Sequence, residues 1–205
     1  MDFSLTEEQT LLQDSVSRFV QNDYGFEARQ KLVRQEPGFS TDHWAKFAEL
    51  GWLGVPFSEE DGGFGGGAVE LILMMEQFGK GLVVEPFLPT VVLAGGAIAL
   101  AGSQDQKAAH LPGIVDGSTQ AALAFAEPQG RYNLADLTTT AKKDGSGYVI
   151  NGYKAVVLGA PWAQKLIVTA RTSGGQRDRD GVSVFIVDKS AAGVSTRDYP
   201  TVDGR

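Results

Sequence analysis

The stretch that decides the fold runs from Ala121 to Asp188 and reads AALAFAEPQGRYNLADLTTTAKKDGSGYVINGYKAVVLGAPWAQKLIVTARTSGGQRDRDGVSVFIVD. Its apolar segments are short and alternating or β-branched, and clusters of turn residues separate them, which is typical of strands. The residues before it place apolar side chains at helical spacing instead. The chain therefore changes from helices to strands near Ala121.

Short apolar segments of the second half predict strands. They cover residues 123–125, 148–150, 155–158, 166–170, 182–187 and 194–199. The intervening Asp144 to Gly147 and Asn151 with Gly152 predict hairpin turns, because Gly and Asn accept the positive φ that tight turns need. This pattern favours a run of antiparallel strands that forms a small barrel or sandwich.

The first half predicts a helical bundle. Thr6 with Gln9, and Ser103 with Gln106, form capping-box patterns at helix starts. A further helix begins at Ser40 or Thr41 and closes at Gly51. The predicted helices span about four turns after Thr6, then residues 26–35, 41–50, 68–78, 90–101 and 103–116. We place the boundary at Gly117 and Ser118, so that residues 1–117 form an α-helical domain and residues 118–205 a β-domain.

The composition excludes several classes of function. The chain has 205 residues and a net charge of −7, which disfavours binding to nucleic acid. It has no cysteine, hence no disulfide and no thiolate site. Its longest apolar run falls well short of the roughly 20 residues that span a membrane, and no secretory leader pattern is present, so we expect a cytoplasmic protein without membrane insertion.

The residues alone give no catalytic constellation and no metal cluster. His43 and His110 are interpreted as partly exposed surface histidines, because neither has a second ligand at metal spacing. The glycine cluster from Ser58 to Gly67 lacks the ending of a phosphate-binding loop and is interpreted as a structural linker, with Glu59 to Asp61 as a solvated acidic run. We therefore expect the chemistry to come from a cofactor.

Five segments carry a resemblance to a known family. LAFAEPQG, TTAKKDGSGYVINGYKAVV, LIVTART and VSVFIVD resemble the middle domain of the acyl-CoA dehydrogenases, and GSQDQKAAHLPGIVDGS resembles the helix that leads into it. The resemblance covers the whole chain and implies an α+β protein: a helical bundle, then an incomplete antiparallel β-barrel or sandwich. The C-terminal helical bundle of the family is absent from this sequence.

The resemblance also implies an activity. Acyl-CoA dehydrogenases oxidise an acyl-CoA thioester to the 2,3-enoyl-CoA with hydride transfer to FAD. The family's glutamate base lies in the C-terminal domain, so no catalytic residue is named in this chain. Expected partners are an acyl-CoA substrate, an electron-transfer acceptor, and either further copies of the chain or a heteromeric dehydrogenase partner. Within the family the sequence resembles small subunits of the pimeloyl-CoA dehydrogenase type, which implies a medium-chain or dicarboxylyl substrate.

The resemblance implies two groups of site residues, several of which depart from the family signature. The cofactor-binding positions are Leu123, Phe125, Ala126, Val156 and Leu158, and the phosphate or substrate positions are Arg131 and Tyr132. Ala126 replaces a hydroxyl that would bond the flavin, Tyr132 a serine, Val156 the aromatic that covers the flavin, and Leu158 a threonine. Two hypotheses stay open: FAD binds through backbone amides and an apolar wall, or the chain is a noncatalytic, flavin-free subunit of a heteromeric dehydrogenase.

Overall fold

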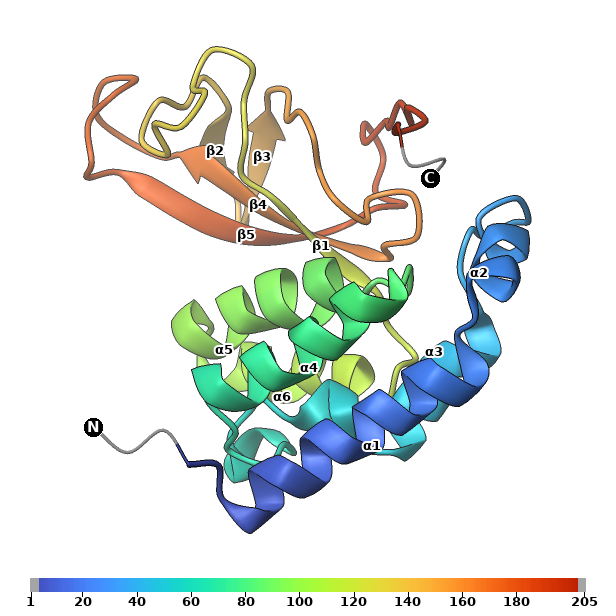
Figure 1. Ribbon diagram of the computed structural model, residues 1–205. Coiled ribbons are helices and arrows are strands. Elements are labelled where there is room, and N and C mark those ends of the chain that lie inside the picture. The colour runs from blue at the N-terminus through green and yellow to red at the C-terminus, as the bar shows by residue number, and fades with distance from the viewer. Residues whose placement is uncertain (1–3, 203–205) are drawn as a thin grey trace. The chain divides into compact units, whose positions relative to one another are not determined.

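The computed structural model describes residues 4–202, which form two compact units (Figure 1). Within this range, the helical unit comprises residues 4–87, 98–118 and 198–202, and the sheet unit comprises residues 88–97 and 119–197. The segment 88–97 thus belongs to the sheet unit, although it lies upstream of residues 117 and 118. Each unit is described by itself below.

The first helices of the helical unit begin at the predicted caps. Helix α1 (Glu7–Asp23) starts at Thr6, whose hydroxyl accepts from the Gln9 N–H at 3.1 Å while Gln9 Oε1 accepts from the Thr6 N–H at 3.0 Å, which confirms the capping box. Helix α2 (Phe26–Leu32) ends three residues before the predicted limit at Gln35. None of its residues is buried, so little packing energy is available to extend it.

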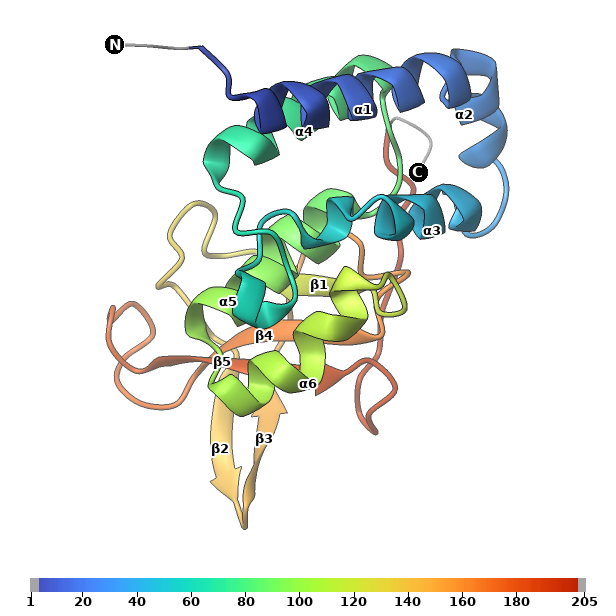
Figure 2. The same cartoon turned by 90° about the horizontal axis from the view of Figure 1, so that it is seen from below.

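An aromatic core joins the next two helices. Helix α3 (Thr41–Glu49) is capped by Ser40 and followed by Gly51 at φ 76°, as predicted. Helix α4 (Ala68–Gly81) lies alongside α1 (Figure 2). Phe47 stacks on Phe78 with ring centroids 5.2 Å apart and lies 5.0 Å from Trp52. Buried aromatic rings of this size supply much of the apolar area that stabilises such a unit.

The glycine cluster between α3 and α4 is held by its own backbone. The Ser58 hydroxyl caps the short 3-10 helix η2 (Glu59–Asp61). A Cβ on Gly63 would lie 2.3 Å from the Phe57 carbonyl oxygen, so only glycine fits there. At the start of α4, the Glu70 carboxylate accepts from the Gly67 N–H at 2.7 Å. The carboxylate of Glu70 thus occupies the N-cap N–H group of α4, and the interpretation of the glycine cluster as a structural linker stays a prediction.

The predicted helix over residues 90–101 takes a different form. Its first part is the π-helix η3 (Leu88–Gly95), which is followed by α5 (Gly96–Ala101). The Thr90 hydroxyl donates to the Ala121 carbonyl at 3.1 Å, which joins η3 to strand β1 within the sheet unit. Helix α6 (Gln104–Val115) in the helical unit begins at the predicted Ser103 capping box.

The sheet is mixed rather than purely antiparallel, which corrects the predicted strand directions. Its strands are β1 (Ala121–Ala124), β2 (Thr140–Asp144), β3 (Gly147–Asn151), β4 (Lys165–Arg171) and β5 (Val182–Asp188). The order is β1-β4-β2-β3, with β5 also paired to β4. Strand β1 runs parallel to β4, and β2 meets β4 in parallel at one residue pair. A connection of some forty residues permits this direction, whereas short hairpins impose antiparallel pairing.

Strand β4 is the centre of the sheet unit. Five of its seven residues are buried, because it has partners on both sides. The core here consists of Ala122, Ala124, Ala163, Leu166 and Val168. The sheet is open, and the β2–β3 hairpin extends away from β4 and β5 (Figure 2).

Several predicted strands and turns have definite outcomes. The hairpin turn between Asp144 and Gly147 is confirmed. Asn151 is the last residue of β3, not part of a second hairpin turn, and residues 155–158 and 194–199 form no strand. Strand β2, with its exposed lysines, was not predicted. Across residues 4–202, no helix is both long and apolar enough to cross a membrane.

Candidate cofactor site

Two predicted segments of the site meet in the sheet unit. The chain leaves β1 at Phe125 and Ala126, and the second segment, residues 154–158, follows β3. The Ala155 N–H donates to the Ala126 carbonyl at 2.9 Å, so the structure places these segments side by side. Their apolar side chains Phe125, Val156 and Leu158, here called the apolar wall, are exposed. Leu123 and Ala126 are half-buried.

Val156 has an unfavourable backbone conformation. Its φ is 53°, which is rare for a β-branched residue, and its side chain is 82% exposed. Such a conformation costs about 1–3 kcal/mol and persists only where the surroundings hold it. Three residues later, a Cβ on Gly159 would lie 2.8 Å from the Pro89 ring, so the segment runs close against η3. The wall is thus built from tightly fixed backbone.

A buried ion pair lies beside the Ala126–Ala155 hydrogen bond. Lys154 Nζ donates to Glu127 Oε1 at 2.7 Å and to the Thr169 hydroxyl on β4 at 3.1 Å. The Glu127 carboxylate also accepts from the Thr138 N–H at 2.7 Å, the Thr138 hydroxyl at 2.6 Å and the Thr139 N–H at 3.1 Å. A carboxylate with this many donors is fully satisfied although it is buried.

The pair favours its ionised form at neutral pH. Burial opposes the charge on Glu127, but the hydrogen bonds from Lys154, Thr138 and Thr139 outweigh it and hold the pKa of Glu127 well below its usual range. For Lys154, burial lowers the pKa and the contact with Glu127 opposes that shift. This carboxylate is therefore fixed as an acceptor, not available as a proton-transfer base.

The predicted phosphate residues lie on an exposed turn. Arg131 has a φ of 48° and an exposed side chain, and Tyr132 is fully exposed. The base of the turn is closed by hydrogen bonds from the Gly130 N–H to the Glu127 carbonyl at 3.0 Å and from the Asn133 N–H to the Gly130 carbonyl at 2.8 Å. Both side chains are thus accessible to a ligand.

A buried arginine at the end of β4 joins two loops of the sheet unit and was missed in the sequence. The Arg171 guanidinium, at the end of β4, donates to the backbone carbonyls of Ala135, Ser173, Gln176, Asp178 and Asp180. It therefore joins the loop of residues 133–138 to the loop of residues 172–181. The available signal was a single charged residue closing the apolar strand LIVTAR.

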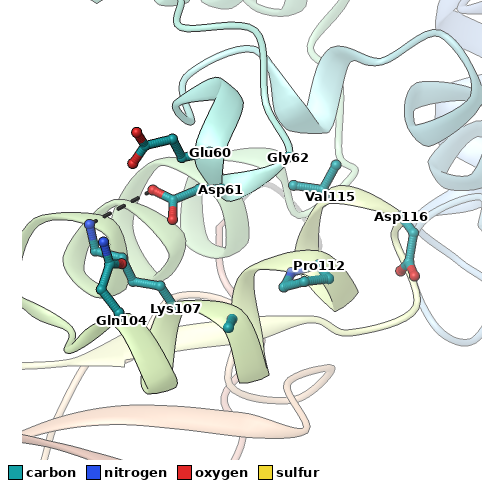
Figure 3. Close-up of a pocket in the computed structure, with 9 residues that line it drawn as sticks. Glu60, Asp61, Gly62, Gln104, Lys107, Pro112, Val115 and Asp116 are labelled. Carbon is teal, nitrogen blue, oxygen red and sulfur yellow. Dashed lines mark ion pairs between the residues drawn. The ribbon is translucent and has the colours of Figure 1, made fainter.

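The helical unit offers a separate, less specific hollow (Figure 3). Glu60 and Asp61 on η2 face Gln104 and Lys107 on α6, with Lys107 Nζ 3.8 Å from Asp61 Oδ2. Its lining carries three carboxylates, those of Glu60, Asp61 and Asp116, against the single ammonium of Lys107. Among residues 4–202, no group of three or more His, Asp or Glu side chains is placed to hold a metal ion.

His43 is more deeply involved in packing than a surface histidine. Its ring meets Phe19 edge-on at 5.2 Å, and Nδ1 lies 3.4 Å from the buried Glu85 carboxylate. The side chain is 23% exposed. The contact with Glu85, 42 residues away in the chain, could not be read from spacing. His110 is half-buried.

Comparisons with known proteins identify the family. The family model of the acyl-CoA dehydrogenase N-terminal domain matches residues 6–118, and that of the middle domain matches residues 122–205. The chain belongs to the acyl-CoA dehydrogenase family. The predicted fold class, a helical bundle followed by an incomplete β-barrel or sandwich domain, is confirmed as a helical region followed by a sheet that is not closed, with the strand directions corrected as above.

One curated relative and two solved structures show the extent of the likeness. Acyl-CoA dehydrogenase FadE12 of Mycobacterium tuberculosis is 36% identical over 196 residues, which cover 94% of this chain and 50% of FadE12. The ChsE4-ChsE5 complex from the same species has a TM-score of 0.85 at 28% identity, over 98% of this chain and 52% of that one. The FAD complex of PigA has a TM-score of 0.82 at 30% identity, over 94% of this chain and 51% of the PigA chain. The chain spans about half the length of the curated relatives it matches.

Proposed function

We propose that this chain belongs to a flavoprotein acyl-CoA dehydrogenase that oxidises an acyl-CoA to the 2,3-enoyl-CoA. FAD would supply the hydride acceptor of that reaction. The apolar wall carries the proposal, because three large apolar side chains stand exposed on two segments whose backbone is fixed and, at Val156, strained. Exposed apolar patches mark ligand or partner sites, and stored backbone strain gathers at functional sites.

The residues present fit the ring system of FAD with fewer polar contacts than the family signature supplies. Phe125, Val156 and Leu158 would hold the flat, apolar face of the isoalloxazine. Arg131, exposed on its turn, would pair with a phosphate of FAD or CoA. Ala126 offers no hydroxyl, a loss of about 0.5–1.5 kcal/mol. Val156 covers less area than an aromatic side chain, which buries about 150–250 Å². We therefore expect FAD to bind more weakly here than in relatives with the full signature.

Restoring the aromatic side chain tests the proposal. FAD is titrated into the chain, and binding is followed by the visible absorption band and by quenching of flavin fluorescence. Val156→Trp should tighten binding about tenfold, because it adds ring area at the wall. Val184→Trp, at an exposed position of β5, should leave the affinity unchanged. Failure of both the wild-type chain and Val156→Trp to bind FAD would refute the flavin site.

A second candidate function rests on the departures from the signature. With Ala126, Val156 and Leu158 in place of two hydroxyls and an aromatic, the chain would serve as a flavin-free subunit of a heteromeric dehydrogenase. The likeness to the ChsE4-ChsE5 complex supports assembly with a different subunit. A heteromer that is active while this chain binds no flavin would favour this function over the first.

Other features of the complete protein are also proposals. We propose a cytoplasmic protein with an acyl-CoA substrate, an electron-transfer acceptor, and either further copies of itself or a heteromeric partner. The pimeloyl-type resemblance, and with it the acyl-chain class, stays a prediction. Turnover of acyl-CoA esters of graded length by the complete protein would test it.

A further inference from the structure

The buried pair of Glu127 and Lys154 joins three parts of the sheet unit. Glu127 follows the wall residue Phe125 and its neighbour Ala126, and its carboxylate accepts from the backbone of Thr138 and Thr139 at the far end of its loop. Lys154 begins the second wall segment and also reaches Thr169 on β4. The side chain of Glu127 is 0% exposed and that of Lys154 is 9% exposed.

The pair and a backbone hydrogen bond form a closed link between the wall segments. Ala126 and Ala155 are joined by a backbone hydrogen bond. Glu127, which follows Ala126, and Lys154, which precedes Ala155, are joined by their side chains. Two adjacent links fix both the spacing and the register of the segments, whereas a single link leaves rotation free. Val156 is the first residue beyond this double link.

Val156 needs such fixation. A β-branched residue at φ 53° relaxes toward extended backbone unless its neighbours prevent it. On its C-terminal side the approach of Gly159 to Pro89 holds the chain. On its N-terminal side the holding contacts are those of Lys154 and Ala155.

Stability alone is a poor explanation of a charged pair in this place. Well-packed apolar residues usually replace a buried ion pair at no cost in stability, because both charges lose their hydration. Apolar residues cannot reproduce the directional geometry of the pair, because hydrogen bonds fix the angle and the partner of each contact and apolar contacts do not.

We propose that Glu127 and Lys154 are a positioning pair that holds the strained apolar wall in the geometry in which it receives the isoalloxazine ring. The inference deepens the proposed flavin function and rests on it. Neither residue is assigned a chemical step. Each acts through Phe125, Ala126 and Val156.

Variants of the pair separate positioning from stability. Lys154→Met removes the cation and keeps the apolar stem, while the double variant Glu127→Gln with Lys154→Met removes both charges and leaves no buried charge unpaired. A stabilising pair alone predicts that the double variant recovers both thermal stability and FAD affinity. The positioning role predicts recovery of thermal stability without recovery of affinity. Lys154→Arg, which keeps the cation, should partly rescue both.

Two readouts are taken on the whole chain: the FAD dissociation constant, and hydrogen exchange of the amides of Thr138, Thr139 and Ala155. Lys154→Met and the double variant should raise the dissociation constant about tenfold and speed these amides by a similar factor. The control is Lys165→Met, which removes an ion pair with Asp188 that is half-exposed and lies on the same sheet. It should change neither readout.

The outcomes distinguish this inference from the proposed function. Unchanged exchange and unchanged FAD affinity in Lys154→Met overturn the positioning pair while leaving the flavin function intact. Absence of FAD binding in the wild-type chain, together with faster exchange in Lys154→Met, overturns the flavin function and supports the pair as the device that fixes the wall. Recovery of affinity in the double variant overturns positioning in favour of a stabilising role.

Discussion

Single residues at this site are stabilised by contacts that lie far away in the chain. Val156 holds a conformation that valine avoids, and Glu127 keeps a buried charge mainly through Thr138, Thr139 and Lys154, which lie 11, 12 and 27 residues away, with Gln129 as one nearby donor. Neither situation arises from local preference, because each costs free energy that only surrounding contacts offset. Substitutions at this scale therefore have effects opposite to those expected from residue type alone.

Val156→Gly should stabilise the folded chain. Glycine removes about 1–3 kcal/mol of backbone strain and costs about 0.5–1 kcal/mol in chain entropy. Little apolar burial is lost, since Val156 is 82% exposed. The midpoint of thermal unfolding should rise, while FAD affinity falls with the loss of wall area. Val149→Gly, in the extended strand β3 and 56% exposed, is the matched control and should lower the midpoint. Equal destabilisation by both variants would show that Val156 is not strained.

His43 should make stability depend on pH. The Glu85 carboxylate raises the pKa of His43 against the effect of burial, and Asp23 and Asp42 add to the rise. A raised folded-state pKa gives stability that is fully present below the ordinary value of about 6.5 and is lost as the pH rises through the folded value. The gap in unfolding free energy between wild type and His43→Gln should therefore be largest near pH 5 and narrow toward pH 9.

Urea unfolding across this pH range measures the gap. Glu85→Gln removes the carboxylate that causes the shift, so the pH dependence that His43 contributes should largely disappear in that background. A gap that stays constant from pH 5 to 9 would mean that His43 contributes through packing against Phe19 alone.

At the scale of elements, β4 is the part on which the site depends. It pairs with β1 and β5, its Thr169 contacts Lys154, and its Arg171 joins the loop of residues 133–138 to the loop of residues 172–181. Removing this buried guanidinium is costly, because its loss breaks the hydrogen bonds to five backbone carbonyls at once.

Arg171→Met should destabilise the sheet unit by about 1–3 kcal/mol and loosen both loops, since five backbone carbonyls lose a charged donor together. Urea unfolding measures the first effect, and limited proteolysis at residues 133–138 and 172–181 the second. Arg177→Met is the control, because Arg177 is 74% exposed and bonds only Asp136 among the contacts described here. In Arg177→Met both loops should stay resistant to proteolysis. If both variants were cleaved alike, Arg171 would have no special role in holding the loops.

At the scale of the whole molecule, the chain is a helical unit and an open sheet unit of the acyl-CoA dehydrogenase family, and it spans about half the length of its curated relatives. The apolar wall belongs to the sheet unit alone. FAD binding by this chain therefore depends on the contacts that the apolar wall and its few polar neighbours can make with the cofactor.

The sequence by itself determined the features that depend on near neighbours. The caps at Thr6, Ser40 and Ser103, the left-handed Gly51 and the turn between β2 and β3 follow from interactions within a few residues. The family also followed from short motifs. Such features need no knowledge of the rest of the fold.

Only the tertiary structure decided how the site is held. The parallel pairing of β1 with β4, the absence of a strand at residues 155–158, and the partners of Glu127, Lys154 and Arg171 join segments tens of residues apart. Residues 155–158 have the composition of a strand, but the positive φ of Val156 and the close approach of Gly159 to Pro89 prevent it. Local pattern measures preference, and here contacts distant in the chain outweigh that preference.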